Sequence, residues 1–301
     1  MRVFVTGGTG FVGHELLRQL TGSGHGARVL VRADSGDKVL QHPLVESVCG
    51  DVTEPNSLEG LLKDCEAVIH LVGVIREFPR RDITFQKLHV EATRRILAAA
   101  EAQGVERYLH MSANGTREGA ATSYHRTKWQ AEEAVRNSSL NWTIFRPSLI
   151  YGRNDQFINM LAEQIRKLPV VPVIGDGQYR MSPVAVEDVA KGFVSALEDT
   201  QTEGGIFHCG GPQAVSYNDL LDQVADAMGK TPPAKLHHPV WLMTPFIRAL
   251  EGLSAFPITR DQLTMLLEGN VCDPRHWCEA CGIVPKPLVQ GLKEMFSGKV
   301  T

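Results

Sequence analysis

The chain has 301 residues, of which 43% are hydrophobic and 22% charged, and its net charge is −3. This balance is typical of a globular protein and provides no basic field for nucleic acid or anionic lipid. No apolar run approaches the ~20 residues that a membrane span needs, and no secretory signal is visible before the first apolar run. Six cysteines in a chain of this length do not predict a disulfide framework. We therefore expect a cytoplasmic protein without a transmembrane segment and without a nucleic-acid partner.

The apolar pattern predicts strands that alternate with helices through the first half of the chain. In chain order the predicted elements are a strand at Arg2–Thr6, a helix at Gly10–Leu20, strands at Ala27–Val31 and Val45–Cys49, a short helix at Asn56–Lys63, a strand at Ala67–Leu71, a long helix at Ile83–Ala102, a strand at Arg107–Met111, a helix at Tyr124–Arg136 and a strand at Asn141–Phe145. Nearly continuous apolar strands belong to parallel sheets that helices cover on both faces. We predict an α/β fold with a Rossmann-type, doubly wound parallel sheet.

After Tyr151 the alternation loosens, although Val186–Leu197 and Tyr217–Met228 still predict helices. We expect residues 1–150, with parts of 180–212, to form a dinucleotide-binding domain, and residues 151–180 and 213–301 to form a smaller C-terminal substrate lobe. The apolar segment Trp241–Phe256 has two interpretations. It is either the core of that lobe or a cover over an apolar substrate such as a quinone or isoprenoid. Apolar helix faces are usually buried, so we expect core.

A glycine-rich motif follows the first strand directly. Gly7, Gly10 and Gly13 form G-x-x-G-x-x-G at the start of a helix. In such a loop the first glycine permits a sharp turn, the second permits close approach of a pyrophosphate, and the third permits tight helix packing. The helix N-terminus offers unpaired N–H groups to the phosphates. The predicted phosphate-binding residues are Gly7, Thr9, Gly10, Phe11, Val12 and Gly13.

The end of the second strand indicates which dinucleotide binds. An acidic residue there grips the adenosine ribose of NAD, but this strand ends in Arg32. Arg32 can meet a 2′-phosphate with charge-assisted hydrogen bonds. Asp34 lies two residues further on and could instead turn toward the ribose. We expect NADP rather than NAD, with Asp51 and Val52 placed after the third strand to touch the adenine.

Several stretches together resemble a known family: TGGTGFVG, GDVTE, HLVG, YHRTK, FRPSLIYG and SPVAVEDVA, in this order from Met1 to about Pro212. They resemble the extended short-chain dehydrogenase/reductase family, and within it the atypical branch that contains the NADPH-binding accessory subunit of respiratory complex I and its bacterial relatives. The resemblance implies a structural role for Asp188. It also implies further cofactor contacts at Leu71, Val72, Gly73, Pro147, Ser148 and Ile150.

Tyr124 and Lys128 lie four residues apart and so share one helix face. An ammonium close to a phenol favours the phenolate, so we expect Lys128 to lower the pKa of Tyr124 from near 10. A tyrosine tuned in this way can exchange a proton with a carbinol oxygen. Such a pair also occurs by chance on exposed helix faces. Its place after the fifth strand favours the dyad, and the resemblance implies that Tyr124 is the acid/base, that Lys128 is its modulator, and that both contact the cofactor.

A third catalytic residue is expected just after the fifth strand, where the family supplies a serine or threonine to hold the substrate oxygen. One alignment places Ser112 in this role, and a shift by one residue places Ala113 there. The segment from Ser112 to Tyr124 is also shorter than in sugar-nucleotide epimerases. Both departures indicate a reshaped substrate side, and loss of such a donor typically costs on the order of 10²–10³ in rate.

Other polar residues have structural interpretations. His70 and His89 are expected to be hydrogen-bonded scaffold residues. Arg76, Arg80 and Arg81 form a basic loop that could recognise a phosphorylated substrate, although such loops are more often solvated.

Three cysteines gather near the C-terminus, at Cys272, Cys278 and Cys281. The C-x-x-C spacing of the last two occurs in zinc knuckles and redox pairs. A structural zinc site usually has two such pairs, and the first is missing here. We therefore expect small buried hydrophobic residues and no metal site.

The leading hypothesis is an NAD(P)-dependent oxidoreductase or epimerase. Hydride would move between the nicotinamide and a carbinol carbon of a small-molecule substrate, either apolar or a sugar nucleotide, while Tyr124 handles the proton. The rival hypotheses are an NADPH-binding structural or assembly protein and a sensor of the NADPH/NADP ratio. A homodimer is compatible with all three.

Overall fold

The computed structural model describes residues 1–54, 56–252, 256 and 258–297. The chain divides into two compact units. The first contains Met1–Pro147, Glu187–Cys209 and Arg275–Val284, and the second contains Ser148–Val186, Gly210–Pro274 and Pro285–Thr301.

The first unit alternates strands and helices. Its elements are β1 (Arg2–Thr6), α1 (Phe11–Gly22), β2 (Gly26–Val31), η1 (Gly36–Lys38), β3 (Val45–Cys49), β4 (Ala67–His70), η2 (Pro79–Arg81), η3 (Gln86–Glu91), α2 (Ala92–Ala102), β5 (Arg107–Met111), α3 (Ser123–Arg136), β6 (Asn141–Pro147), α5 (Val186–Glu198), η4 (Thr200–Thr202), β11 (Gly205–Cys209) and α9 (Arg275–Cys281).

Within the described residues, one parallel sheet has the order β11-β6-β5-β4-β1-β2-β3. The chain winds outward from β1 in one direction through β2 and β3, and in the other through β4, β5 and β6. This is the order of a doubly wound dinucleotide-binding sheet, and the predicted fold class is confirmed. The strand order reverses beside β1, so the crevice at the carboxyl ends of β1 and β4 is where a ligand is expected.

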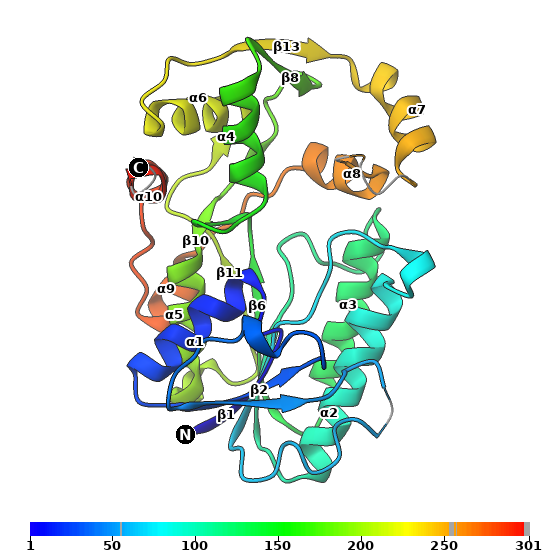
Figure 1. Ribbon diagram of the computed structural model, residues 1–301, viewed down its shortest axis with the longest axis vertical. Helices are drawn as coiled ribbons and strands as arrows, with labels where there is room; N and C mark the ends of the chain where they lie inside the picture. Colours follow the sequence, from blue (N-terminus) through cyan, green and yellow to red (C-terminus); the bar gives the residue numbers. More distant parts are fainter. Residues whose placement is uncertain (55, 253–255, 257, 298–301) are drawn as a thin grey trace. The chain divides into compact units, whose positions relative to one another are not determined.

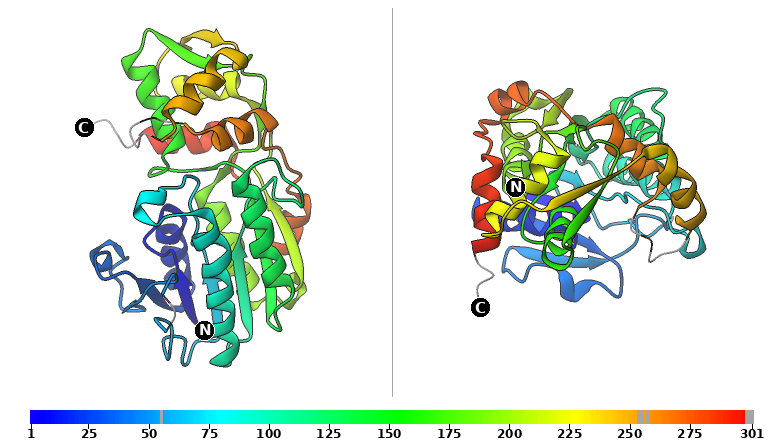
Figure 2. Two further views of the ribbon diagram at one scale, coloured as in Figure 1. Left: turned by 90° about the vertical axis from the view of Figure 1, so that its right-hand side faces the viewer. Right: turned by 90° about the horizontal axis from the view of Figure 1, so that it is seen from above.

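Helices cover both faces of this sheet. Figure 1 shows α2 and α3 side by side on one face, and α1 and α5 on the other; the turned view in Figure 2 shows the same pair, α2 and α3, along the sheet. Apolar side chains of the strands and helices meet between these layers. The core on the α2/α3 face includes Phe4, Val68, Ala92, Ile96, Tyr108 and Ile144.

Two predicted elements differ in the structure. The predicted short helix at Asn56–Lys63 is wrong, because this segment forms a series of turns. Gly60 has φ +71° and Asp64 φ +62°, which a right-handed helix cannot contain. The predicted long helix begins after Ile83, which instead bridges Phe78, and its first turns are a π-helix at η3.

Residues Arg275–Val284 return to the first unit late in the chain. Trp277 of α9 is fully buried, and its indole ring packs on Gly192 of α5. A Cβ built on Gly192 would lie 2.6 Å from the indole Nε1, so only glycine fits there. This contact anchors α9 beside the sheet.

The second unit contains shorter elements. They are β7 (Ile150–Tyr151), α4 (Phe157–Lys167), β8 (Val170–Ile174), β9 (Arg180–Met181), β10 (Val184–Ala185), β12 (Val215–Ser216), α6 (Tyr217–Ala227), β13 (Ala234–His238), α7 (Val240–Leu250), α8 (Arg260–Glu268) and α10 (Leu288–Ser297). Helices α4, α6 and α10 enclose its core, which includes Ile158, Leu161, Leu220, Val224 and Leu292.

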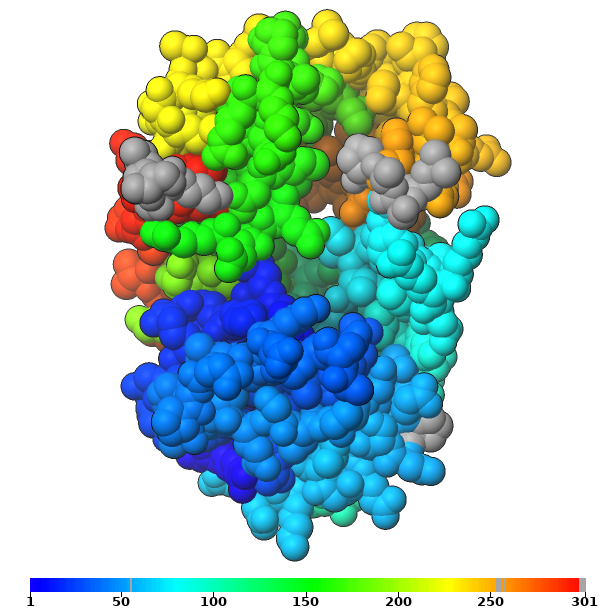
Figure 3. Space-filling view, viewed as in Figure 1, coloured from blue at the N-terminus to red at the C-terminus, as the bar shows by residue number. Residues whose placement is uncertain are grey.

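Helix α7 corrects the expectation that Trp241–Phe256 is lobe core. Of its residues only Ile247 is buried, whereas Trp241 is 76% and Phe246 56% exposed. In the space-filling view the golden segment that contains α7 lies at the outer surface of its unit (Figure 3). The apolar face of this helix therefore points to solvent. Residues 253–255 of the predicted segment lie outside the described residues.

Among the helices in the described part of the chain, none has both the length and the apolar character that crossing a membrane requires.

Candidate functional site

The glycine loop between β1 and α1 has the shape of a phosphate cradle. Gly7 adopts φ +76°, and the Gly10 N–H donates a 3.0 Å hydrogen bond to the Gly7 carbonyl, which closes the turn. A Cβ on Gly13 would lie 2.6 Å from the Gly8 Cα and would overlap the Gly7 carbonyl oxygen. Gly7 is therefore favoured by its positive φ, and Gly13 is required by close backbone approach.

The start of helix α1 is open to a ligand. Gly10 caps it without a side-chain hydrogen bond, and its first turn carries no acidic residue. The first N–H groups of a helix lack intrahelical partners, and they attract anions. Gly7 also lies against the end of β4, where a Cβ would be 3.1 Å from the Leu71 carbonyl carbon and 3.2 Å from the Val72 nitrogen. The cradle thus opens at the predicted crevice, and its residues fit a dinucleotide pyrophosphate.

The residues after β2 and β3 are those predicted to contact the adenosine half of the cofactor. Arg32 is exposed directly after β2, and its guanidinium makes no hydrogen bond or ion pair with any residue that the structure describes. The Asp34 carboxylate accepts a hydrogen bond from the Ser35 hydroxyl at 3.1 Å. Asp51 accepts two 2.8 Å hydrogen bonds from Thr53, one from its N–H and one from its hydroxyl, which shapes the loop that contains Val52. Their contacts with a cofactor stay predictions.

Lys128 connects three elements at the carboxyl edge of the sheet. It is only 3% exposed, and its Nζ donates a 3.0 Å hydrogen bond to the Met111 carbonyl at the end of β5. A Cβ built on Gly73, after β4, would lie 3.0 Å from this nitrogen. The structure therefore brings together Gly73 and Lys128, which were predicted from separate motifs. Burial lowers the pKa of Lys128 to about 8.

The Tyr124 ring is bracketed by three other rings. Phe85, His89 and His125 meet it edge-on, with ring centroids 5.7, 5.3 and 5.1 Å away. Burial raises the pKa of Tyr124 to about 12, so the expected lowering by Lys128 is wrong for this structure. The phenolate would lose hydration, and the ammonium of Lys128 is directed to Met111.

Ser112 lies where the third catalytic residue was expected, directly after β5. Its N–H bonds the Phe145 carbonyl at 2.8 Å, and its hydroxyl lies 3.4 Å from the Thr116 hydroxyl. Ser112 is buried, whereas Ala113 is half-buried. Because the Lys128 amine bonds the carbonyl just before the Ser112 amide, the two residues share the end of β5. A hydrogen bond between Ser112 and the substrate stays a prediction.

The segment predicted to flank the nicotinamide spans the boundary between the units. Pro147 ends β6 and accepts a 2.9 Å hydrogen bond from the Asn114 N–H. Ser148 and Ile150 belong to the second unit, where the Ser148 hydroxyl bonds the Asn270 carbonyl at 2.6 Å and Ile150 pairs with Val184. Their part in a cofactor site stays a prediction.

Three buried histidines surround Lys128. His89 Nδ1 lies 2.9 Å from the Thr127 hydroxyl, and its Nε2 lies 3.0 Å from the Val74 carbonyl, which ties α3 to the loop after β4. His70 Nδ1 lies 2.6 Å from the Thr6 hydroxyl, and its ring stacks on His110 at 5.6 Å. Burial and the Lys128 charge lower the pKa of His70 to about 3 and of His89 to about 2, and that of His110 well below its usual value. All three are neutral scaffold groups.

Sequence reasoning missed an ion pair behind the dyad. Glu132 of α3 is 0% exposed, and its carboxylate accepts two hydrogen bonds from Arg146 of β6, at 2.8 and 2.5 Å. Arg136 approaches the same carboxylate at 3.3 Å and stacks over the Trp129 ring at 4.3 Å. The sequence contained one indication of it: Glu132 follows Lys128 by four residues, so the two share one helix face.

The three C-terminal cysteines are divided between the two units. Cys272 belongs to the second unit, whereas Cys278 and Cys281 lie in α9 of the first. Burial raises the pKa of Cys272 to about 11 and of Cys281 to about 12, so both stay thiols. In the part of the chain that is described, no group of three or more His, Cys, Asp or Glu residues could hold a metal ion.

The basic loop after β4 is organised around one aromatic ring. Arg76 and Arg81 lie over the Phe78 ring, at 5.4 and 6.0 Å from its centroid, and Arg80 is exposed. Cation–π contacts of exposed groups are worth about 0.5–1 kcal/mol, so this packing orders the loop modestly. Recognition of a phosphorylated substrate stays a prediction.

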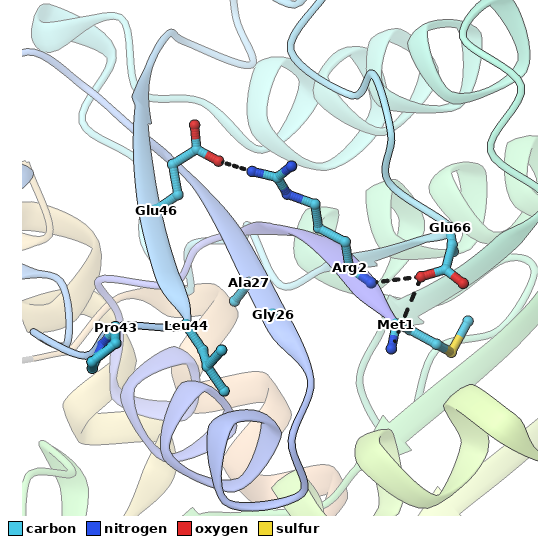
Figure 4. A pocket seen from close by; sticks show the side chains of 8 residues that line it. All are labelled: Met1, Arg2, Gly26, Ala27, Pro43, Leu44, Glu46 and Glu66. Atoms are coloured by element: carbon cyan, nitrogen blue, oxygen red, sulfur yellow. Dashed lines mark hydrogen bonds and ion pairs between the residues drawn. The ribbon is translucent and has the colours of Figure 1, made fainter.

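A pocket of about 380 Å³ lies at the opposite, amino edge of the sheet (Figure 4). Its charged groups pair with one another: Arg2 with Glu46, and the Met1 amine and the Arg2 N–H with Glu66. Ligands of doubly wound folds bind at the carboxyl edge, so we do not assign the site to this pocket.

A family model described as the NAD dependent epimerase/dehydratase family matches residues 3–210. The chain belongs to this family. The matched range includes the glycine cradle, the Tyr124–Lys128 pair and strand β11.

Three similar proteins illustrate the range of this family. Ceramide reductase of Caulobacter vibrioides is 34% identical over 240 residues, which cover 76% of this chain and 71% of that protein. NADH dehydrogenase [ubiquinone] 1 alpha subcomplex subunit 9 of Arabidopsis thaliana is 30% identical over 246 residues, 78% of this chain but only 60% of that protein. The structure of UDP-glucose 4-epimerase from Thermotoga maritima superimposes with a TM-score of 0.77 at 20% identity, and all of both chains is covered. The last similarity shows the fold.

Proposed function

We propose that this protein is an NADPH-dependent reductase of an apolar ketone, with Tyr124 as proton donor. The observation that carries the proposal is the convergence of Gly73, Lys128 and the end of β5 at the carboxyl edge of the sheet, beside the glycine cradle. Family membership supports nicotinamide chemistry. The substrate class and the direction of hydride transfer go beyond family membership and are proposed here.

The cofactor would lie on the residues that fit it. The cradle Gly7–Gly13 would hold the pyrophosphate, Arg32 would bind a 2′-phosphate, and Gly73 would lie along the nicotinamide half, where a side chain would collide with Lys128. When bound, the coenzyme would supply the hydride to the carbonyl carbon.

The proton would come from this chain. A phenol with a pKa near 12 is protonated at neutral pH, as the proton donor of a carbonyl reduction must be. The O–H bond of Tyr124 would break as its proton moves to the substrate oxygen. The Lys128 ammonium, whose Nζ donates to the Met111 carbonyl here, would have to turn toward the phenolate left behind in order to stabilise it. The Ser112 hydroxyl would hydrogen-bond the same substrate oxygen.

One comparison supports an apolar substrate. The relative from Caulobacter vibrioides is named for the reduction of ceramide. A sugar nucleotide is the competing substrate class, since the epimerase of similar fold carries UDP-glucose.

The test follows NADPH binding and NADPH oxidation separately. We expect NADPH oxidation with a long-chain ketone in detergent micelles, and no conversion of UDP-glucose into its 4-epimer in the presence of NAD. Tyr124→Phe should keep NADPH affinity within about twofold and lower kcat by on the order of 10²-fold or more. Tyr108→Phe, a buried tyrosine of β5, is the matched control and should leave kcat unchanged. Equal rates for Tyr124→Phe and the parent protein would remove Tyr124 from the mechanism.

The second candidate function is a non-catalytic NADPH-binding subunit. The Arabidopsis thaliana relative, named as a subunit of NADH dehydrogenase, favours it. Tight NADPH binding without oxidation by any ketone or sugar nucleotide, together with stabilisation of the fold by NADPH alone, is the result that this candidate predicts.

A further inference from the structure

Helix α3 contains a buried carboxylate one turn beyond Lys128. Residues four apart on a helix are neighbours on one face, and Glu132 is 0% exposed there. A buried carboxylate requires a partner of opposite charge. Arg146 provides it from β6 through two parallel N–H···O bonds of 2.8 and 2.5 Å, and Arg136 adds a third contact at 3.3 Å. The Glu132 carboxylate is therefore paired with two arginines inside the unit.

The other titratable groups that face Lys128 carry no charge near neutral pH. They are Tyr124 on α3, His89 on η3, His70 on β4 and His110 on β5, and burial disfavours the charged form of each. Burial also disfavours the ammonium of Lys128, whereas the negative charge of Glu132 favours it. Of the groups named here, Glu132 is the one that opposes the loss of the Lys128 proton.

We propose that Glu132 is a positioning residue that keeps Lys128 in its ammonium form, and that Arg146 limits how strongly the carboxylate acts. The effect of Glu132 on the Lys128 charge does not depend on the proposed function, whereas the role of Lys128 in proton donation rests on it. The proposed step needs the ammonium next to the Tyr124 phenolate, so the charge state of Lys128 controls proton donation.

The two partners of the ion pair have opposite effects in this proposal. Removing the negative charge of Glu132 leaves the positive charges of Arg146 and Arg136 to repel the ammonium. Removing the positive charge of Arg146 leaves Glu132 less compensated, so its attraction for the ammonium grows. Two unit charges roughly 6–10 Å apart in a medium with a dielectric constant of about 20 shift each other's titration by roughly one to two pH units. A merely structural ion pair would weaken the fold in both variants without opposite shifts.

The experiment titrates Lys128 in cofactor-free protein. Lysine labelled with ¹³C at Cε is followed by NMR, and the Lys128 resonance is identified by its loss in Lys128→Met. We expect a midpoint near 8 in the parent protein, a midpoint at least about one unit lower in Glu132→Gln, and a higher midpoint in Arg146→Gln. Glu133→Gln is the control, because Glu133 pairs with Arg136 from an exposed position on the same helix.

Two results would overturn the inference: an unchanged midpoint in both variants, or shifts of both in the same direction. If Glu132→Gln fails to fold, the shift in Arg146→Gln decides alone, since a midpoint at or below that of the parent contradicts the proposal. The pH dependence of kcat/KM with NADPH then tests the proposed function separately. Opposite NMR shifts without a matching change in the rate profile would support the ion-pair effect and remove Lys128 from the reaction.

Discussion

The amine of Lys128 donates a 3.0 Å hydrogen bond to the carbonyl oxygen of Met111, the last residue of β5. This bond fixes a lysine from helix α3 at the carboxyl edge of the sheet, beside Gly73 and Ser112. The position is buried, and burial lowers the pKa of Lys128 to about 8. At neutral pH the site therefore holds an ammonium at a cost in stability.

We expect Lys128→Met to be more stable than the parent protein at pH 7, by about 2 kcal/mol, since each pKa unit is worth about 1.4 kcal/mol and the lost bond to Met111 offsets part of the gain. The folded pKa lies below the unfolded value of 10.5, so the unfolded chain binds more protons between these values. The parent therefore gains stability as pH rises from 8 to 10.5, and the difference should shrink in this window. Urea unfolding at pH 7, 9 and 10.5 measures it. Lys63→Met, at an exposed lysine, should show no such trend.

We expect the protein to lose stability steeply below pH 6.5. His110 is 1% exposed and its ring stacks against the rings of His70 and Tyr108, and its pKa is well below the ordinary value of 6.5. As pH falls below 6.5, the unfolded histidine takes up a proton that the folded one cannot, at about 1.4 kcal/mol per pH unit. Between pH 7 and 5, the free energy of unfolding of His110→Phe, measured by thermal unfolding, should fall less steeply than that of the parent, by about 1.4 kcal/mol per pH unit. His14→Phe, at an exposed histidine, should follow the parent, and parallel slopes for His110→Phe would contradict the prediction.

We expect Gly13→Ala to weaken both the fold and dinucleotide binding. The added Cβ would overlap the Gly7 carbonyl oxygen and lie 2.6 Å from the Gly8 Cα, and backbone cannot yield without opening the cradle. Overpacking of this kind costs about 1–3 kcal/mol. Gly22→Ala, at the other end of the same helix, meets no atom within 4 Å and should stabilise by up to about 1 kcal/mol. Urea unfolding and NADPH titration check both variants, and equal behaviour would show that the loop does not need glycine.

We expect Arg32→Ala to lower NADPH affinity by about 10–100-fold, the loss of charge-assisted hydrogen bonds, and to leave NADH affinity within about twofold. NADH serves as the internal control, because it lacks the 2′-phosphate. Calorimetric titration of both coenzymes measures the ratio. A parallel fall in both affinities would mean that Arg32 stabilises the end of β2 and does not bind the 2′-phosphate. No change in either affinity would mean that Arg32 does not belong to the cofactor site.

Much of the first unit could be predicted because its patterns are local. The runs at Arg2–Thr6 and Arg107–Met111 are strands with those limits. A strand buried on both faces can be predicted from its apolar residues alone, because both of its faces contact helices. The segment Asn56–Lys63 shows the limit of this reasoning. Its leucines follow helical spacing, but Gly60 and Asp64 adopt positive φ, and the buried Leu58 and Leu62 reach the core from turns.

Helix α7 and the Tyr124 pKa show a second limit. An apolar helix is usually buried, yet whether a partner surface covers it depends on elements far away in the chain. The phenol was expected to respond to its neighbour on the helix. Burial among Phe85 and His89, which lie before helix α3 in the chain, and the adjacent His125 has the larger effect.

The amino-acid sequence by itself determined the glycine cradle, the helix face that Tyr124 and Lys128 share, and most of the alternation of strands and helices in the first unit. Each depends on backbone geometry within a few residues. Only the tertiary structure decided that Lys128 meets Gly73 and Met111, that Glu132 pairs with Arg146, and that α7 is exposed. These contacts join residues from separate strands and helices, and the physical reason is that charge and burial are set by what the folded chain brings together from distant positions.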